Sequence, residues 1–265
     1  MSFDFANILF GGPCNLRCPY CIGRQVEPAL THNNLNRFPL RNLARFTDLI
    51  KFHRVSQVVF TGTTTDPLLY RHQVRLLIWL REALPPYPLT NGSTQPVCYS
   101  LHTNGRLALP QLETFNLYDR VCISFPSFRP DTYARMTGSI HVPDLAEIVR
   151  QARAPVKVSC IITDDNAGEI DEFLERCLDI GIKRLVFRQP YGDTRRSNIL
   201  AHLPQICTYR RNPVYDYHGL EVTCWNFHQT TSASLNLFSD GTISADYLLA
   251  PTKNRNVSTQ PAKCW

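Results

Sequence analysis

Six short runs of β-branched and aromatic residues alternate with helical patterns, and this alternation constrains the fold more than any other feature. The strand-like runs cover residues 4–10, 57–62, 97–103, 120–125, 156–162 and 184–189. The helical patterns cover about 39–53, 69–84, 110–117, 143–152 and 167–180. Strands that alternate with helices favour a parallel sheet with right-handed crossovers. The sequence therefore predicts an α/β protein with parallel strands.

The spacing of these units favours a barrel. The six units between residues 4 and 189 average roughly 31 residues, close to the unit of an eight-unit barrel of about 250 residues. We therefore expect a partial (β/α)6 TIM barrel that is open on one side. A doubly wound open sheet is the alternative, and the spacing separates the two folds poorly.

The alternation of strand-like and helical patterns ends after residue 190. The remaining chain has several prolines and a strong hairpin signal, in which Asp240-Gly241 separates two alternating apolar runs. We expect a barrel core over 1–190 and a short C-terminal extension over 191–265. The extension is expected to cap the barrel mouth and not to form an independent domain.

The composition limits the cellular compartment and the classes of partner that we expect. Ten cysteines in 265 residues with 43% hydrophobic content fit a reduced, cytoplasmic protein better than a small disulfide scaffold. No signal-peptide pattern or membrane-length apolar run is found, so no membrane partner is expected. The net charge of +6 comes mainly from arginine, which suits an anionic substrate. The alternative, favoured by the modest size of the charge, is that these arginines are solvated surface residues. No basic block of the kind found in nucleic-acid-binding arms occurs, which argues against a nucleic-acid partner.

Three cysteines, Cys14, Cys18 and Cys21, follow the first predicted strand in the pattern C-x3-C-x2-C. Barrel active sites are built at the carboxyl ends of the strands. Three thiolates on one loop can hold three irons of a 4Fe–4S cluster and leave the fourth iron open for chemistry. Structural zinc is the alternative, but such sites close with four ligands, and no fourth Cys or His has finger spacing here.

The stretch CNLRCPYC resembles the cluster motif of the radical S-adenosylmethionine (radical SAM) superfamily. The resemblance implies that Cys14, Cys18 and Cys21 ligate the cluster and that Tyr20 packs at the adenine of S-adenosylmethionine (SAM). It implies that one-electron reduction cleaves SAM to a 5′-deoxyadenosyl radical, which abstracts a hydrogen atom. An electron donor such as flavodoxin or ferredoxin would then be a partner.

A second match follows the second predicted strand, where the superfamily has a Gly-Gly-Glu-Pro loop for the amino group of methionine. This chain has Thr64-Thr65-Asp66-Pro67 there, so the acid and the proline remain while the glycines do not. The resemblance assigns Asp66 to the methionine ammonium. The alternative is that Asp66 caps a helix with Pro67 at its first position, and the two roles are compatible.

Residues 100–105, 123–138 and 156–189 are similar to the molybdenum-cofactor GTP cyclase (MoaA-like) branch. That resemblance implies that Ser124 contacts the ribose and Arg188 the carboxylate of SAM. The alternatives are that Ser124 satisfies backbone groups at a strand end and that Arg188 is an ordinary ion-pair partner.

Members of this branch often carry extra clusters in the C-terminal extension. Here Cys207, Cys224 and Cys264 are widely spaced, and a second cluster would need an unusual ligand such as Asp246 or His228. We therefore expect an extension without a cluster.

The resulting prediction is a radical SAM enzyme that acts on a small metabolite or nucleotide. One alternative is a peptide-modifying maturase. Against it, the 13 residues that precede Cys14 are too few for an N-terminal leader-peptide-binding domain. The other is a non-catalytic iron–sulfur or zinc protein, which would leave SAM intact.

Overall fold

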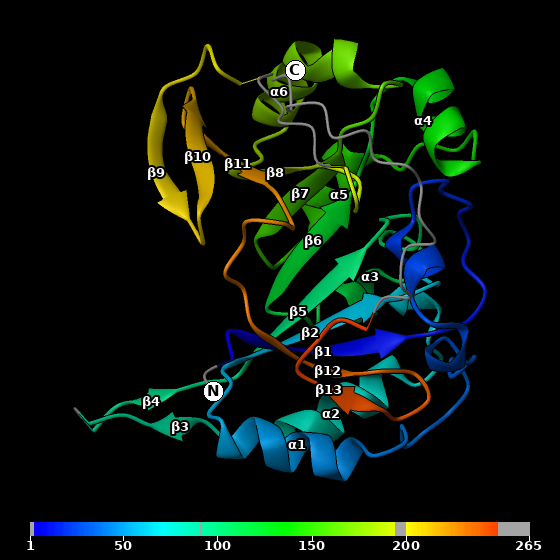
Figure 1. Cartoon of the computed structure of the whole chain (residues 1–265), viewed down its shortest axis with the longest axis vertical. Helices are drawn as coiled ribbons and strands as arrows, with labels where there is room; N and C mark the ends of the chain where they lie inside the picture. The colour runs from blue at the N-terminus through cyan, green and yellow to red at the C-terminus, as the bar shows by residue number, and fades with distance from the viewer. Residues whose placement is uncertain (1–2, 91, 194–199, 249–265) are drawn as a thin grey trace.

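The computed structural model describes residues 3–90, 92–193 and 200–248, and one large sheet dominates it (Figure 1). Within these residues the sheet has 11 strands, in the order β13-β12-β1-β2-β5-β6-β7-β8-β11-β10-β9. A separate hairpin of two strands, β3 (Tyr87–Pro88) and β4 (Thr94–Gln95), projects from the body. No helix in the described part of the chain is long and apolar enough to cross a membrane.

The six predicted strands form the centre of this sheet. They are β1 (Phe5–Phe10), β2 (Gln57–Gly62), β5 (Cys98–Thr103), β6 (Arg120–Ser124), β7 (Val156–Ile161) and β8 (Arg184–Arg188). Each pairs in parallel with the next one along the chain, with no reversal of order. A doubly wound sheet would reverse its order at a switch point. The prediction of a partial barrel is therefore confirmed.

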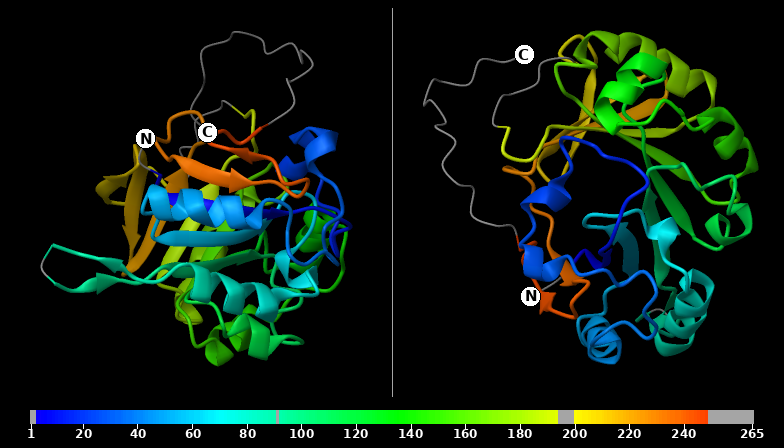
Figure 2. Two further views of the ribbon diagram at one scale, coloured as in Figure 1. Left: turned by 90° about the horizontal axis from the view of Figure 1, so that it is seen from below. Right: turned by 90° about the vertical axis from the view of Figure 1, so that its right-hand side faces the viewer.

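Helices cover the outer side of the curved sheet, as the right-hand view of Figure 2 shows. They are α1 (Leu43–Phe52), α2 (Gln73–Ala83), α3 (Leu112–Phe115), α4 (Pro130–Thr137), α5 (Leu145–Gln151) and α6 (Ile170–Asp179). Four 3-10 helices are η1 (Ile22–Gln25), η2 (Pro28–Leu30), η3 (Pro67–Leu69) and η4 (Ala167–Glu169). Five of the α-helices lie within the predicted segments. Helix α4 does not, because two of its four buried residues are threonines, Thr132 and Thr137, which leaves few apolar positions to display a helical period.

The main hydrophobic core lies between the sheet and these helices. Leu101 of β5, Ile123 of β6 and Val158 of β7 belong to it, together with Phe46 of α1 and Leu174 of α6. Successive side chains of a strand point to opposite faces. The residues next to these core positions therefore point into the barrel.

The C-terminal extension adds strands to both edges of the barrel sheet. These strands are β9 (Gln205–Tyr209), β10 (Asn212–Tyr217), β11 (Leu220–Trp225), β12 (Ser234–Leu237) and β13 (Ile243–Ser244). Strand β11 pairs in parallel with β8, whereas β12 pairs in parallel with β1. Residues 226–233, which join β11 to β12, consequently cross the open side of the barrel (Figures 1 and 2).

The hairpin predicted around Asp240-Gly241 is β12–β13, which is antiparallel. Gly241 has φ +98°, and its N–H donates to the carbonyl of Phe238 at 2.9 Å. The division of the chain after residue 190 stays a prediction. The described strands of the extension lie at the sheet edges, and residues 249–265 of the expected cap lie outside the described residues.

Asp4, just before β1, forms hydrogen bonds with the end of the segment that crosses the open side, residues 226–233. Its N–H donates to the carbonyl of Ala233 at 2.9 Å, and its carboxylate accepts from the N–H of Ala233 at 2.8 Å. The same carboxylate forms an ion pair with Arg210, and both side chains are about one quarter exposed. These contacts join the first barrel strand to the turn between β9 and β10.

Candidate functional site

The three cysteines lie on the loop that follows β1, at the carboxyl end of the barrel strands. Cys14 is exposed, Cys18 and Cys21 are half-buried, and none of them forms a disulfide. Burial raises the pKa of the Cys18 thiol to about 11, and the neighbouring Cys21 and Cys14 contribute to this rise. The pKa of Cys14 is also raised, by partial desolvation of its thiol although the residue is exposed, with Asp66 and Cys21 among the contributors. The loop therefore gathers three free thiols near one another.

This donor set fits an iron–sulfur cluster. Each thiolate ligand of a cluster binds a different iron, so the three sulfur atoms need not converge on one point. No group of three or more His, Cys, Asp or Glu side chains in the described part of the chain is arranged to hold a single metal ion. A four-ligand zinc site is therefore not formed by the described residues.

A run of threonines after β2, residues 63–65, supports the cysteine loop from one side. The hydroxyl of Thr63 donates to the carbonyl of Phe10 at 3.0 Å, that of Thr64 to the carbonyl of Gly12 at 3.1 Å, and that of Thr65 to the carbonyl of Pro13 at 2.6 Å. The Thr64 hydroxyl also accepts from the N–H of Gly12 at 3.2 Å. Of these, Thr64 and Thr65 lie at the positions that the sequence resemblance aligns with the two glycines of the superfamily loop.

The residues that follow Cys18 also pack closely against the threonine run. A Cβ atom added to Gly23 would lie 1.7 Å from the carbonyl oxygen of Thr63. Only glycine fits there without movement of the backbone. The thiol of Cys21 also approaches the same carbonyl, at 3.7 Å.

Asn104 and Arg106, which follow β5, support the cysteine loop from the other side. The amide of Asn104 donates to the side-chain oxygen of Asn15 at 2.7 Å. The guanidinium of Arg106 donates to the carbonyl of Asn15 and to the hydroxyl of Ser139, both at 3.1 Å. Sequence reasoning did not single out Asn104 or Arg106, although both lie in or beside the stretch 100–105 that resembles the MoaA-like branch.

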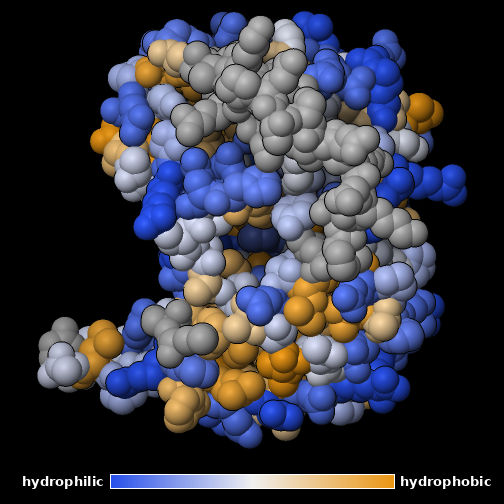
Figure 3. Space-filling view, viewed as in Figure 1, coloured by the Kyte–Doolittle hydropathy of each residue, from blue (hydrophilic) through white to orange (hydrophobic). Residues whose placement is uncertain are grey.

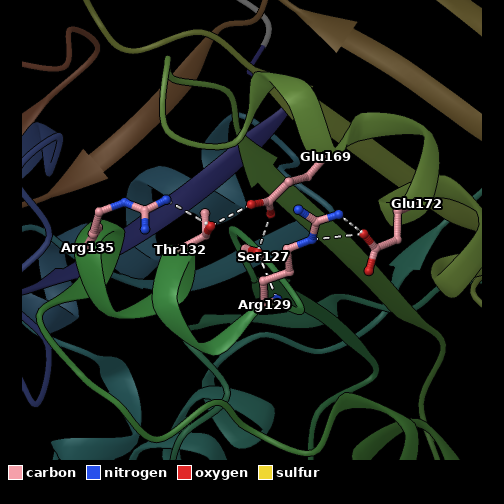
Figure 4. A network of polar contacts seen from close by, with 6 residues as sticks. All are labelled: Ser127, Arg129, Thr132, Arg135, Glu169 and Glu172. Carbon is pink, nitrogen blue, oxygen red and sulfur yellow. Dashed lines mark hydrogen bonds and ion pairs between the residues drawn. The ribbon is translucent and has the colours of Figure 1, made fainter.

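Helix α4 provides a third support. The N–H of Arg17 donates to the carbonyl of Thr137 at 2.8 Å. Figure 4 shows the polar network that anchors this helix. Glu169 accepts from the hydroxyls of Ser127 and Thr132, each at 2.5 Å, and so ties the start of α4 to the start of α6.

A second contact in Figure 4 reinforces that tie. The Nε of Arg129 donates to the carboxylate of Glu172 at 2.9 Å. Because this pair is largely exposed, we expect it to contribute little to stability. The buried part of the network, around Glu169, is what orients α4 toward the cysteine loop.

Asp66 is buried, at 3% exposure, and its carboxylate is surrounded by donors. It caps η3 by accepting from the N–H of Leu68 at 2.9 Å, with Pro67 at the first helical position. It also accepts from the N–H of Asn104 at 2.7 Å and from the hydroxyl of Thr103 at 2.9 Å. Burial raises the pKa of Asp66, while the N–H groups of Asn104 and Leu68 lower it. Asp66 thus joins the β2 loop to the β5 loop, and a contact with SAM stays a prediction.

The other predicted cofactor contacts lie at the same end of the barrel. Tyr20 is half-buried, and burial followed by the nearby Cys18 raises its pKa. Ser124 is the exposed last residue of β6, and it pairs in register with Ser159 of β7. Arg188 is the half-buried last residue of β8, and its Nε has no hydrogen-bond partner among the described residues. Contacts of these side chains with SAM stay predictions.

The inner face of the sheet beneath this rim carries two cationic side chains, Lys157 and Arg188, with the imidazole of His102 near them. His102, Lys157 and Arg188 alternate with core residues of β5, β7 and β8, so they point inward. Burial, then Lys157, then Arg188 lower the pKa of His102 well below its ordinary value. Figure 3 shows a hollow near the centre of the face on view.

Comparison with known proteins assigns the class. The profile of the Radical SAM superfamily matches residues 8–186, which is most of the chain. The chain therefore belongs to the radical SAM superfamily. It is an enzyme of that superfamily, whose members use a 4Fe–4S cluster and SAM, so the predicted class and cofactors are confirmed.

The curated relatives are GTP 3′,8-cyclases, as the resemblance to the MoaA-like branch predicted. The enzyme of Rhodococcus opacus (strain B4) is 29% identical over 175 residues, which cover 64% of this chain and 46% of the relative. That of Petrotoga mobilis is 27% identical over 203 residues, covering 73% of this chain and 58% of the relative. The chain thus spans about half the length of the curated relatives it matches.

Among solved structures, SuiB of Streptococcus suis has a similar fold. Its complex with the precursor peptide SuiA gives a TM-score of 0.54 at 17% identity, covering 72% of this chain and 40% of SuiB. SuiB bound to S-adenosylmethionine gives a TM-score of 0.52 at 16% identity, covering 74% of this chain and 41% of SuiB. At this identity the likeness concerns the fold alone.

The cysteines of the extension do not gather in the described residues. Cys207 lies on β9 and Cys224 on β11, and β10 separates these two strands in the sheet. Cys264 lies outside the described residues. The absence of a second cluster stays a prediction.

Proposed function

We propose that this enzyme cleaves SAM reductively to a 5′-deoxyadenosyl radical, which abstracts a hydrogen atom from a small metabolite or nucleotide. The observation that carries the proposal is the loop of Cys14, Cys18 and Cys21, which presents free thiols at the carboxyl rim of a parallel barrel. When bound there, the cluster supplies the one electron that cleavage of SAM requires. The family membership supports the same chemistry.

In this proposal the three cysteines hold the cluster, and Tyr20, Asp66, Ser124 and Arg188 belong to the cofactor site. The backbone of the cysteine loop is bound by side chains of the β2 and β5 loops, which supports a rim that is formed before the cofactor arrives. Such preorganisation reduces the ordering cost of binding. For Asp66, the role best supported is to hold the two loops together.

The charge inside the barrel supports an anionic substrate. Lys157 forms no ion pair with another described residue, so its charge is available to a substrate, while Arg188 is assigned to the cofactor. A lysine ammonium binds phosphate as a point charge. The activity named for the curated relatives, GTP 3′,8-cyclase, supports a nucleotide within this class. A peptide-modifying activity and a non-catalytic role are the competing functions.

The test uses protein purified without oxygen and reconstituted with iron and sulfide. We would count iron and sulfide, reduce with dithionite, add SAM and measure 5′-deoxyadenosine by mass spectrometry. The variants Cys14→Ala, Cys18→Ala and Cys21→Ala serve as controls. We expect about four irons per chain and no 5′-deoxyadenosine from any of the three variants.

Other results would redirect the assignment. About eight irons per chain would indicate a second cluster and make Cys207, Cys224 and Cys264 the next targets. Bound zinc, or SAM that stays intact under reduction, would refute the proposal and favour the non-catalytic role.

A further inference from the structure

A continuous surface beside the cysteine loop has no role in the function proposed above. We call it the rim surface and define it as residues 33–39 and 68–78, which include most of the residues that line two pockets. Backbone and side-chain contacts join the two segments. The N–H of Arg71 donates to the carbonyl of Leu35 at 2.9 Å, and the hydroxyl of Tyr70 donates to the carbonyl of Arg37 at 2.8 Å.

The rim surface is basic and partly apolar. Arg37, Arg71 and Arg75 are exposed, while no Asp or Glu occurs in residues 28–47 or 67–81. Val74 and Ile78 are 44% and 54% exposed on the same surface. Arginine combined with exposed apolar side chains is the composition of protein–protein interfaces.

The rim surface begins directly against the cysteine loop. The N–H of Asn34 donates to the carbonyl of Gly11 at 3.1 Å, and the N–H of Gly11 donates to the side-chain oxygen of Asn34, also at 3.1 Å. A Cβ atom on Gly12 would lie 2.9 Å from the side-chain oxygen of Asn33. Gly12 is two residues before Cys14, so a protein bound at this surface would approach the cluster site.

We propose that the rim surface docks an acidic one-electron carrier protein. The partner would lose one electron and the cluster would gain it, so this inference rests on the proposed function. Complementary charge at an interface raises the rate of association and fixes orientation. The electron donor predicted from sequence would then have a defined binding site, next to the loop that carries the cluster ligands.

A protein partner fits this surface better than RNA does. Single-stranded RNA is bound by exposed aromatic rings on which bases stack. The ring of Phe38 is covered by the guanidinium of Arg75, 4.2 Å from its centroid. The exposed apolar residues are instead the aliphatic Val74 and Ile78.

The test reverses charge at two arginines whose side chains have no partner among the described residues. In the double variant Arg37→Glu/Arg71→Glu the backbone contacts of both residues are retained. Arg153→Glu is the matched control, because Arg153 is exposed and lies just before β7, at the opposite end of the barrel. Equal melting temperatures would establish that all three chains are folded.

Two readouts are needed. Binding of an oxidised acidic flavodoxin is measured by calorimetry at low and high salt, which requires no catalysis. Formation of 5′-deoxyadenosine is measured with flavodoxin hydroquinone and, separately, with dithionite. We expect the double variant to bind flavodoxin about tenfold or more weakly at low salt. Its rate of 5′-deoxyadenosine formation with flavodoxin should fall by the same factor, while its rate with dithionite stays unchanged. Arg153→Glu should match the wild-type chain in flavodoxin binding and in both rates.

Unchanged flavodoxin binding in the double variant would overturn the docking proposal. The docking proposal would also be overturned by a structured RNA that binds the wild-type chain, binds the double variant more weakly and is not displaced by flavodoxin. If dithionite with SAM yields no 5′-deoxyadenosine even from the wild-type chain, the proposed function fails. The binding arm would still decide whether an acidic protein docks at the rim surface.

Discussion

The two faces of the barrel sheet differ in chemistry although the same strands form both. On the outer face Phe60, Leu101 and Ile123 are fully buried against the helices. On the inner face the same strands and their neighbours present His102 and Lys157. Among the described residues a second, small apolar cluster packs against this face at Leu9, together with Val26, Leu30 and Phe238.

The difference separates stability from chemistry. Burial of large apolar side chains is the dominant favourable contribution to folding, and it is concentrated on the outer face. Charged groups that point inward without a partner contribute no comparable stability, because their desolvation is not compensated. We therefore expect substitutions on the outer face to lower stability and most substitutions on the inner face to alter binding.

The largest effect is expected for Phe60→Ala on the outer face. Phe60 is fully buried and lies 5.2 Å from the ring of Tyr118 and 6.0 Å from that of Phe10. Its loss should lower the free energy of unfolding by about 3–5 kcal/mol, measured by urea denaturation. The matched control is Thr61→Ala, the next residue, which points inward and should cost about 1 kcal/mol or less. Equal losses in the two variants would contradict the separation of the faces.

A smaller effect is expected for Asn236→Ala, an inner-face position where polar groups are paired. The amide of Asn7 donates to the side-chain oxygen of Asn236 at 2.8 Å, and both residues are buried. Truncation should cost about 1–3 kcal/mol, because the Asn7 amide is left unpaired. The double variant with Asn7→Ala should lose less than the sum of the single losses. Strict additivity would rule out this pairing as the cause.

Arg188→Met should separate stability from binding at one position. The Nε of Arg188 is buried without a partner among the described residues, so its removal should raise the free energy of unfolding by about 1 kcal/mol. SAM-dependent formation of 5′-deoxyadenosine should fall about tenfold or more, since a charge-assisted hydrogen bond contributes about 1.5–3 kcal/mol. A variant that loses stability while keeping full activity would refute both expectations.

The smallest effect is expected from His102→Gln and depends on pH. Burial, with Lys157 and Arg188, lowers the pKa of His102 in the folded chain, so the unfolded chain binds the proton more readily. The contribution of neutral His102 is complete above the unfolded pKa of about 6.5 and is lost as the pH falls below it. Between pH 7.5 and 5.5 the wild-type chain should lose about 1 kcal/mol more than His102→Gln. Parallel losses in denaturant titrations would contradict this.

Local patterns predicted the six barrel strands and five of the helices to within a few residues. Alternation, apolar period and turn residues act over a few positions, so they are readable without tertiary contacts. Strands β9, β10 and β11 were not predicted. Much of β9 is exposed, and Pro213 lies within β10, which weakens the strand signal.

For the candidate site, the sequence placed three cysteines on the loop after the first strand, as the structure has them, while their role as cluster ligands stays a prediction. The spacing of Cys14, Cys18 and Cys21 on one loop indicates the cluster by itself, because three ligands on a short loop need no partner from elsewhere. Asn104 and Arg106 are polar residues beside a turn, with nothing in the local sequence to mark them. Only their contacts with Asn15 reveal that they support the cysteine loop.

The sequence by itself determined the alternation of strands and helices and the position of the three predicted cluster ligands on the first loop, because each depends on short-range patterns. The strand order, which separates a partial barrel from a doubly wound sheet, was decided by the tertiary structure. Tertiary structure decided that β11 and β12, neighbours in the chain, pair with opposite edges of the sheet. It also decided that the hydroxyl of Thr64 binds the backbone of Gly12, 52 residues away. Such pairings follow from the closure of the whole sheet around a shared core, and no local pattern specifies them.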